Sequence, residues 1–477
     1  MLAFRVTRRR ALGGMAAVAG ATLSGVLLAA CGGSASTSPT TVPAATAQPP
    51  AAARTVASAP TQATAAQPAT AATAAPIKVT YWSAFGGDLG KAEQELVNRF
   101  AKSQNKVALD YQFQGSYEDT AQKLTAAVAA KQTPEIAILS DVWWEKFWLG
   151  KLLAPMNPYM QVDQVSPSDY VDSFVNEGTR SGNLYWLPFA RSTPLFYYNA
   201  DMFDAAGIKA APETWDELVS MGEKLVNRDN GKLTVAAFAH ANGASYIAWV
   251  FQPVVWAYGG RLSDDNDKIT IDQPPGVDAG QLYSDLVHKY KIASTPKDNG
   301  VDFTNGLAAS ITGSTASLGT IEKTAKFKVG TAFLPKAKQF GCCTGGSGMG
   351  LLSTSSPEKQ AAAFQWANFA TNDDSTTYWS QTTGYMPVRK KAIASDQMAQ
   401  FYKEHPNFQT AVNQLAKTQP QDWARVGIPN GDQIIGSGIE RFVINQENPA
   451  TVLKDVAATL TKEGASVLRQ LQALQGG

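Results

Sequence analysis

After a low-complexity N-terminal stretch, the apolar residues switch repeatedly between two spacings, and this alternation limits the folds open to the chain. Residues 77–82 alternate as in a strand, and a helical spacing follows. Residues 106–113 return to alternation, Ser116 begins a second helical pattern, and residues 135–139 form a short apolar run. Strand, helix, strand, helix, strand within about sixty residues requires right-handed crossovers between parallel strands. We therefore expect an α/β lobe.

A second series of the same kind predicts a second lobe. It contains a strand over 195–198, a helix opened by a capping box of Thr214 and Glu217, and a helical stretch over 245–258. A further helix is expected over 356–370, with serine as its cap and proline at its first position. The chain therefore has room to cross between two α/β lobes more than once.

The N-terminus has the order of an export signal. Four arginines precede position 11, residues 11–30 are apolar and rich in small side chains, and Cys31 follows. This order is typical of a cleaved signal peptide, with an uncleaved membrane-spanning helix as the alternative. Residues 28–31 resemble a lipobox, which implies cleavage after Ala30 and lipidation of Cys31. Residues 7–12 also resemble a twin-arginine signal without its usual aromatic residue, so the general export route stays open.

Residues 32–76 have the composition of a tether. They are almost wholly Ala, Thr, Ser, Pro, Gln and Gly, with Arg54 as their only charge. Such a segment buries too little apolar surface to offset its ordering entropy, so a disordered linker is expected. The remainder, residues 77–477, is long enough for two cores.

Charge and cysteine use exclude several classes of partner. Four of the 41 basic residues lie in the leader, so the rest of the chain has fewer basic residues than its 40 acidic ones. Because no block of like charge is present, nucleic acid is not an expected partner. Beyond Cys31 only the adjacent Cys342 and Cys343 remain, too few for a zinc site or a disulfide framework. A strained vicinal disulfide and two reduced thiols both stay open.

Signals for catalysis are scarce. The three histidines are scattered, and no serine stands in a G-x-S-x-G turn. Asp141 and Glu145 are candidates for the carboxylate pair of a glycoside hydrolase, but nothing in the sequence sets their separation. We expect no enzymatic activity, no cofactor and no metal. A lipid-anchored hydrolase and a surface adhesin on a stalk are the competing classes.

Features that favour binding are better represented. Trp143, Trp144 and Trp148 follow the strand over 135–139 and offer apolar faces that suit sugars and polyols, with core packing as the alternative. Asp141 falls at the carboxyl end of the same strand, where open α/β sheets bind ligands. Capping the next helix is an equally good use of its carboxylate.

Four strings, in this order, carry a family resemblance. They are Tyr-Trp at 81–82 with Gly-Asp-Leu-Gly-Lys at 87–91, Gly-Ser-Tyr-Glu at 115–118, Ser-Thr-Pro-Leu-Phe-Tyr-Tyr-Asn at 192–199, and Thr-Gly-Tyr-Met-Pro-Val at 383–388. Together they resemble the extracellular solute-binding proteins of carbohydrate ABC importers, and among these the glycerol-3-phosphate binders. The resemblance covers the chain from about residue 77 to the C-terminal helix.

The resemblance implies an α/β architecture with the type II periplasmic-binding-protein fold. Two α/β lobes would be joined by a hinge of several segments and close on a ligand between them. Lobe 1 would comprise residues 77–189 plus about 343–371, and lobe 2 residues 190–342 plus about 372–477.

The resemblance also implies ligand contacts at six positions. These are Tyr117, Asp141 in place of the expected glutamate, Ser192, Ser314, Gly346 and Tyr385. Tyrosine, serine and backbone N–H groups offer neutral, directional bonds to hydroxyl or phosphoryl oxygens.

One departure from the family pattern concerns charge. The glycerol-phosphate binders supply an arginine shortly after an Arg-x-Gly segment, whereas residues 425–435 contain no second basic residue after Arg425. A buried phosphate needs a cation or several N–H donors. Arg191 or Arg425 would have to substitute, and otherwise we expect an uncharged oligosaccharide or polyol.

The function implied is that of the substrate-binding component of an ABC importer. As a monomer, it would capture a carbohydrate or polyol and deliver it to the permease subunits. Glycerol 3-phosphate or a glycerophosphodiester is the alternative solute. The lipid would hold the protein at the outer face of the cytoplasmic membrane or in the periplasm.

Overall fold

The computed structural model describes residues 75–475, which belong to one compact unit. The expected leader, the lipidated Cys31 and residues 32–74 of the expected linker lie outside this range. Within it, no helix is both long and apolar enough to cross a membrane.

The strands are β1 (Ile77–Ser83), β2 (Val107–Phe113), β3 (Ile136–Ser140), β4 (Thr179–Arg180), β5 (Asn183–Leu184), β6 (Leu187–Ser192), β7 (Pro194–Asn199), β8 (Asn227–Asp229), β9 (Lys232–Val235), β10 (Phe238–Ala239), β11 (Ala293–Ser294), β12 (Ser310–Ser314), β13 (Val329–Ala332) and β14 (Gly345–Leu351).

The helices are α1 (Gly87–Ser103), α2 (Tyr117–Ala130), α3 (Trp144–Leu149), α4 (Asn157–Val162), α5 (Asp172–Glu177), α6 (Ala200–Ala205), α7 (Trp215–Leu225), α8 (Ala244–Ala257), α9 (Pro274–His288), α10 (Asn299–Thr304), α11 (Leu318–Thr324), α12 (Pro357–Ala370), α13 (Asp373–Thr383), α14 (Lys390–Ile393), α15 (Asp396–Glu404), α16 (Pro406–Leu415), α17 (Trp423–Val426), α18 (Gly431–Val443) and α19 (Pro449–Gln475), with short 3-10 turns η1 (Pro167–Asp169) and η2 (Thr315–Ser317).

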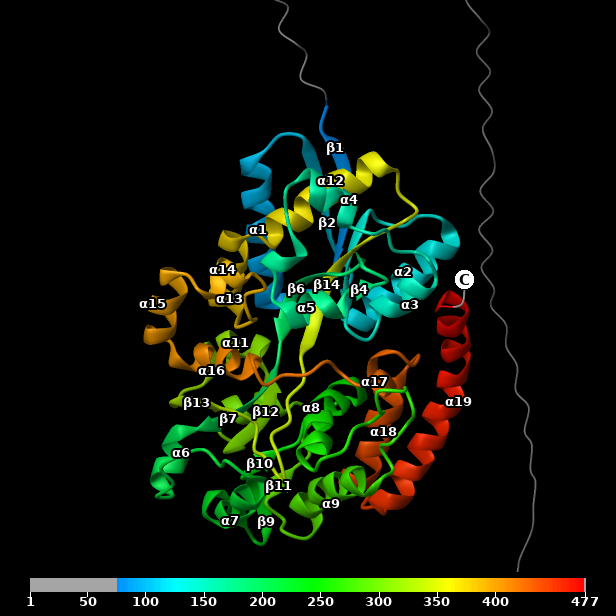
Figure 1. Ribbon diagram of the computed structural model, residues 1–477. Coiled ribbons are helices and arrows are strands. Elements are labelled where there is room, and N and C mark those ends of the chain that lie inside the picture. Colours follow the sequence, from blue (N-terminus) through cyan, green and yellow to red (C-terminus); the bar gives the residue numbers. More distant parts are fainter. Residues whose placement is uncertain (1–74, 476–477) are drawn as a thin grey trace, which may run out of the picture. The chain divides into compact units, whose positions relative to one another are not determined.

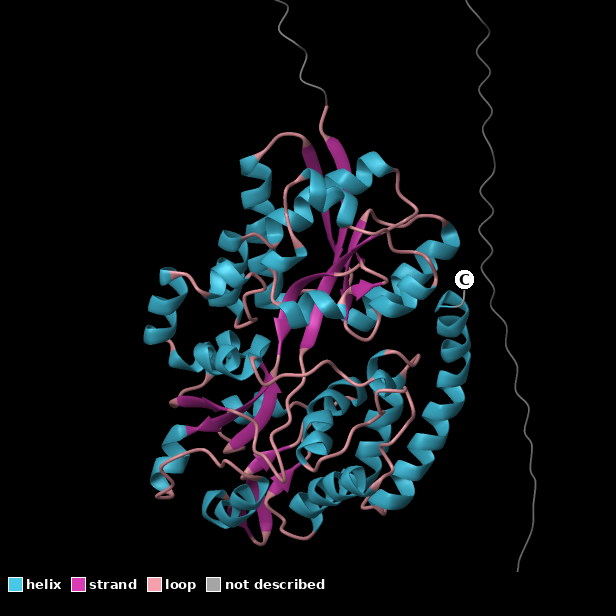
Figure 2. Ribbon diagram, viewed as in Figure 1, coloured by secondary structure: helices cyan, strands magenta, loops and turns pink. Residues whose placement is uncertain are grey.

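Two five-stranded sheets, each flanked by helices, form two α/β lobes (Figures 1 and 2). The first has the order β2-β1-β3-β14-β6, in which β1 pairs in parallel with β2 and β3. The parallel pairing predicted for the first three strands is therefore confirmed. Strand β14 lies antiparallel to both β3 and β6, so distant segments complete the sheet.

The second sheet has the order β11-β10-β12-β7-β13. Strand β10 is parallel to β11 and β12, whereas β7 is antiparallel to both of its neighbours. The strand predicted over 195–198 is thus the inner strand β7, buried along most of its length.

The predicted helix starts are largely confirmed. The Ser116 hydroxyl accepts a hydrogen bond from the Asp119 N–H, and the Asp119 carboxylate accepts one from the Ser116 N–H. Helix α2 therefore begins with a complete capping box. For α7 only half of the predicted box forms. Thr214 accepts the Glu217 N–H at 3.1 Å, but the Glu217 carboxylate accepts from Glu213 at 2.7 Å instead of from the cap.

The chain passes between the sheets at the junction of β6 and β7, and again between β13 and β14. Helix α13 packs against α1 and α12, whereas α16 packs against β13. Because α13 also packs against α11, which lies between β12 and β13, it sits at the junction of the lobes, and we propose that the last passage lies beyond residue 383 instead of near 372. The division into lobes at these residues remains our proposal, with that boundary moved.

The adjacent cysteines are both free and buried. The alternative of a vicinal disulfide is therefore wrong for this structure. The Cys342 thiol donates to the Cys343 carbonyl oxygen at 3.6 Å, and the Cys343 thiol to the Trp249 carbonyl at 3.8 Å. Burial raises the pKa of Cys343 to about 12, so both cysteines act as small protonated core residues.

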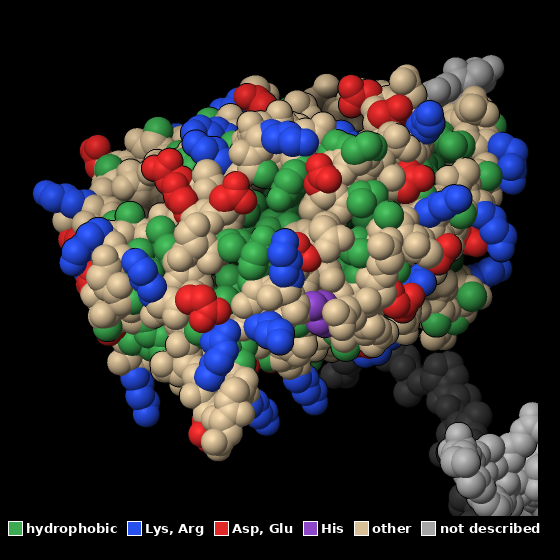
Figure 3. Space-filling model, turned by 90° about the horizontal axis from the view of Figure 1, so that it is seen from below, with side chains coloured by type: hydrophobic (Ala, Val, Ile, Leu, Met, Phe, Trp, Pro, Cys, Tyr) green, Lys and Arg blue, Asp and Glu red, His purple; other side chains and the backbone are tan. Residues whose placement is uncertain are grey.

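On the face drawn in Figure 3, basic and acidic side chains are interspersed with apolar ones. This mixture agrees with a sequence that contains no block of like charge.

Candidate functional site

A cavity of about 570 Å³ is lined by residues from both lobes, a size that suits a small solute. Seven of the eight ligand contacts predicted from the sequence line it: Tyr117, Asp141, Ser192, Ser314, Gly346, Tyr385 and Arg425. Further lining residues that the sequence analysis missed include Ser245, Tyr246, Trp249 and Gln433.

Two tyrosines form a hydroxyl pair at the cavity. The Tyr117 hydroxyl donates to the Ser347 hydroxyl at 3.1 Å and lies 3.3 Å from the Tyr385 hydroxyl. Tyr117 opens α2 and Tyr385 follows α13, so their contact joins segments far apart in the sequence. Burial raises the pKa of Tyr117 to about 12. Both groups are therefore neutral donors and acceptors at physiological pH.

Position 346 requires a glycine because of its backbone conformation and its close contact with β6. Its φ is +104°, and a Cβ there would meet the Ala190 carbonyl oxygen at 2.0 Å. Its own carbonyl accepts the Asp141 N–H at 3.0 Å. The glycine thus lets β14 approach β6, and its carbonyl holds the backbone that carries Asp141.

Ser314 connects two parts of the cavity wall. Its hydroxyl accepts the Ala316 N–H at 3.1 Å and so caps η2, while its own N–H donates to the Tyr246 hydroxyl at 2.8 Å. The serine hydroxyl proton therefore stays available to an acceptor on a solute.

Arg191, which the sequence analysis also considers as a ligand contact, is not among the residues that line the cavity. Its side chain is fully buried, pairs with Glu177 and lies 4.7 Å from the Trp186 ring centre. The reason is the period of two in a strand: Ser192 faces the cavity, so its neighbour in β6 points away. The same burial raises the pKa of Glu177, although the charge of Arg191 opposes that shift.

Arg425 and Asp141 meet through a residue that the sequence analysis did not identify. The Gln421 amide donates to the Asp141 carboxylate, and its carbonyl oxygen accepts from the Arg425 guanidinium. Arg425 NH1 lies 3.7 Å from Asp141 Oδ2, and all three side chains are at least nine-tenths buried. Asp141 therefore faces a partner instead of capping a helix.

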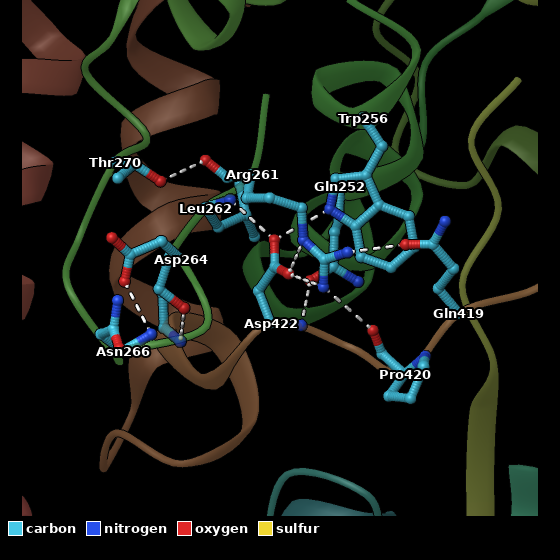
Figure 4. Close-up of polar contacts among 12 residues, drawn as sticks. Gln252, Trp256, Arg261, Leu262, Asp264, Asn266, Thr270, Gln419, Pro420 and Asp422 are labelled. Atoms are coloured by element: carbon cyan, nitrogen blue, oxygen red, sulfur yellow. Dashed lines mark hydrogen bonds and ion pairs between the residues drawn. The ribbon is translucent and has the colours of Figure 1, made fainter. Parts of the chain in front are cut away.

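A buried polar cluster holds the segment that carries Gln421 and Arg425 (Figure 4). The Asp422 carboxylate accepts from Trp256 Nε1 at 2.8 Å, from the Leu262 N–H at 2.7 Å, and from Arg261. The Asp422 N–H donates to Gln252 at 3.0 Å. These bonds fix the backbone on both sides of Asp422, and burial raises the pKa of its carboxyl.

The tryptophans expected near the ligand are divided among different surroundings. Trp144 is a core residue, stacked on Trp186 with ring centres 5.8 Å apart. Trp148 lines a different cavity, and Trp249 of α8 lines the first one. The helical spacing of apolar residues did not single out Trp249 as a cavity residue, because α8 is buried along nearly its whole length.

The carboxylate pair considered for a hydrolase is not formed. Asp141 lines the first cavity, whereas Glu145 lines the second and pairs with Arg180 at 2.8 Å. Two carboxyls in separate cavities do not face one glycosidic bond. The described residues also contain no cluster of His, Cys, Asp and Glu that could hold a metal ion.

Comparison with known proteins gives the family. Residues 95–410 match the model of the bacterial extracellular solute-binding proteins. The sn-glycerol-3-phosphate-binding periplasmic protein UgpB of Yersinia pestis bv. Antiqua is 26% identical over 430 residues, which cover 83% of this chain and 94% of the relative. The protein of the same name from Escherichia coli K12 is 24% identical, with 83% and 93% covered.

Solved structures agree with this family. UgpB from Mycobacterium tuberculosis, in complex with glycerophosphocholine, is 33% identical, with a TM-score of 0.76 and coverage of 83% of this chain and 99% of that one. Maltose-bound MalE3 of T. maritima shares the fold at 22% identity and a TM-score of 0.72, with 81% and 99% covered.

The chain belongs to the bacterial extracellular solute-binding proteins. The predicted type II binding-protein fold is confirmed, and the chain is the solute-binding component of an ABC importer.

Proposed function

We propose that the protein binds a glycerophosphodiester outside the cytoplasm. The observation that carries this proposal is the position of Arg425, which lines the cavity and is only 4% exposed. Its Nε has no hydrogen-bond acceptor among the described residues. A buried guanidinium with a spare N–H favours an anionic oxygen, and a phosphoryl group suits its planar geometry. The missing second basic residue is therefore no obstacle to a phosphate.

The charge of the cavity favours a phosphodiester over a phosphomonoester. Arg425 is close to Asp141, and Glu118 also lines the cavity. A monoester carries close to two negative charges at neutral pH, whereas a diester carries one. One arginine beside two carboxylates leaves a formal net charge of about −1 at this wall, so a singly charged diester is repelled less than a doubly charged monoester.

The rest of the cavity suits a glycerol moiety. The hydroxyls of Tyr117, Ser192, Ser314 and Tyr385 line it, and each can donate to or accept from an alcohol. The family adds support, since relatives named for sn-glycerol 3-phosphate align over 83% of the chain. The M. tuberculosis relative was solved with glycerophosphocholine.

Calorimetric titration of the purified protein with glycerophosphocholine, glycerol 3-phosphate and maltose tests the proposal. We expect glycerophosphocholine to bind most tightly. Arg425→Gln should weaken it by about ten- to a hundredfold, because a hydrogen bond to a charged group contributes about 1.5–3 kcal/mol. Arg425→Lys should retain part of the affinity.

Arg228→Gln is the matched control, since Arg228 pairs with Glu223 at the surface, 3.1 Å away, and does not line the cavity. It should leave every titration unchanged. Tight maltose binding that is insensitive to Arg425→Gln would overturn the phosphodiester proposal in favour of a neutral saccharide.

We also propose that a lipid on Cys31 anchors the protein at the outer face of the cytoplasmic membrane. The support is the leader and the Leu-Ala-Ala-Cys string at 28–31. In cell fractionation, Cys31→Ala should move the protein from the membrane to the soluble fraction. Retention in the membrane would contradict the anchor.

A further inference from the structure

A second cavity of about 690 Å³ adjoins the first and is also lined from both lobes. Its walls include three aromatic residues, Trp148, Tyr185 and Trp423, and four charged ones, Glu145, Lys151, Arg180 and Asp267. Aromatic faces beside carboxylates and a guanidinium suit a polyhydroxylated group. The chemistry of this space therefore differs from that of an apolar packing gap.

The two cavities are divided by the three side chains that meet across the lobes. Asp141 and Arg425 line only the first cavity, whereas Gln421 lines only the second. Because Gln421 bonds to both of the others, its side chain stands in the wall between the two spaces. Gln421 is 9% exposed. Its chain neighbour Asp422 is held by the hydrogen bonds drawn in Figure 4.

We propose that Gln421 is a specificity-determining residue, which ends the solute cavity and keeps the solute out of the aromatic second cavity. This inference rests on the proposed function. It means that the headgroup of the phosphodiester must be small enough to fit beside Arg425. On this proposal a bulkier, ring-shaped polyol headgroup extends toward the second cavity, which Gln421 closes off.

Two replacements separate the volume of Gln421 from its hydrogen bonds. Gln421→Ser removes most of the side chain and should join the cavities, whereas Gln421→Met keeps a similar volume without the amide. The probes are glycerophosphocholine and glycerophosphoinositol, titrated into wild type and both variants. We expect Gln421→Ser to change the ratio of the two dissociation constants by about tenfold or more in favour of glycerophosphoinositol. The methionine variant should keep the wild-type ratio within about threefold.

The outcomes are distinct. If wild type binds neither diester, the proposed function is overturned and this inference with it. If wild type binds glycerophosphocholine but Gln421→Ser leaves the ratio unchanged, only the role of Gln421 is overturned. An equal shift in both variants would also overturn it, because the hydrogen bonds and not the volume would then decide. Circular dichroism confirms that each variant is folded, and Gln421→Ala replaces the serine variant if that one is not.

Discussion

At the scale of single residues, Glu93 is a buried carboxyl outside the cavity whose ionisation couples stability to pH. Its buried carboxyl accepts hydrogen bonds from Tyr81, at 2.5 Å, and from Ser83. Burial raises the pKa of Glu93 from 4.5 to about 7, although these hydrogen bonds oppose the shift. Because the folded pKa exceeds the unfolded one, the folded state binds more protons between these values. The contribution of Glu93 to the free energy of unfolding is complete below pH 4.5 and is lost as pH rises through 7.

Urea unfolding at pH 5 and pH 8 measures this contribution. The free energy of unfolding of wild type should fall by about 3 kcal/mol more than that of Glu93→Gln over this interval, from a pKa shift worth about 1.4 kcal/mol per unit. Glu95→Gln, an exposed position on the same helix, should behave like wild type. Parallel pH profiles for wild type and Glu93→Gln would contradict the shift.

At the scale of elements, helix starts connect stability to the site. Ser116 caps α2 immediately before the cavity residue Tyr117, and Ser395 caps α15, whose residues do not line the cavity. Either serine-to-alanine change should lower the free energy of unfolding by about 1 kcal/mol, the usual value of a cap. Only Ser116→Ala should also weaken glycerophosphocholine binding, because it frees the turn that positions the Tyr117 hydroxyl. Chemical unfolding and calorimetry measure the two effects, and equal affinities for the two variants would contradict the coupling.

At the scale of the whole molecule, the solute cavity takes its walls from both lobes, so binding should draw the lobes together. Small-angle scattering should show a smaller radius of gyration with saturating glycerophosphocholine. Arg425→Gln, titrated at the same ligand concentration, should show less of this change. An unchanged wild-type profile at calorimetrically confirmed saturation would contradict closure.

Much of the local structure could be predicted from the sequence, because periodicity and caps are short-range signals. The strand and helix order of the first lobe, the cap at Ser116 and the parallel pairing of β1 with its neighbours follow from spacing alone. Of the seven predicted residues that line the cavity, six were implied by the family resemblance, and Arg425 was named as a substitute for the family's missing arginine. None required knowledge of how distant segments meet.

The sequence by itself determined the elements, the two α/β series and seven of the positions that line the cavity. Only the tertiary structure decided which groups face one another, because contacts across 280 residues leave no periodic trace. From the sequence, Arg191 and Arg425 were both candidates for a contact with phosphate. The alternation of side chains along β6 turns Arg191 into the core, whereas the hydrogen bonds of Asp422 hold the segment that places Arg425 at the cavity. Gln421 had no signal at all, since its role exists only where the two lobes meet.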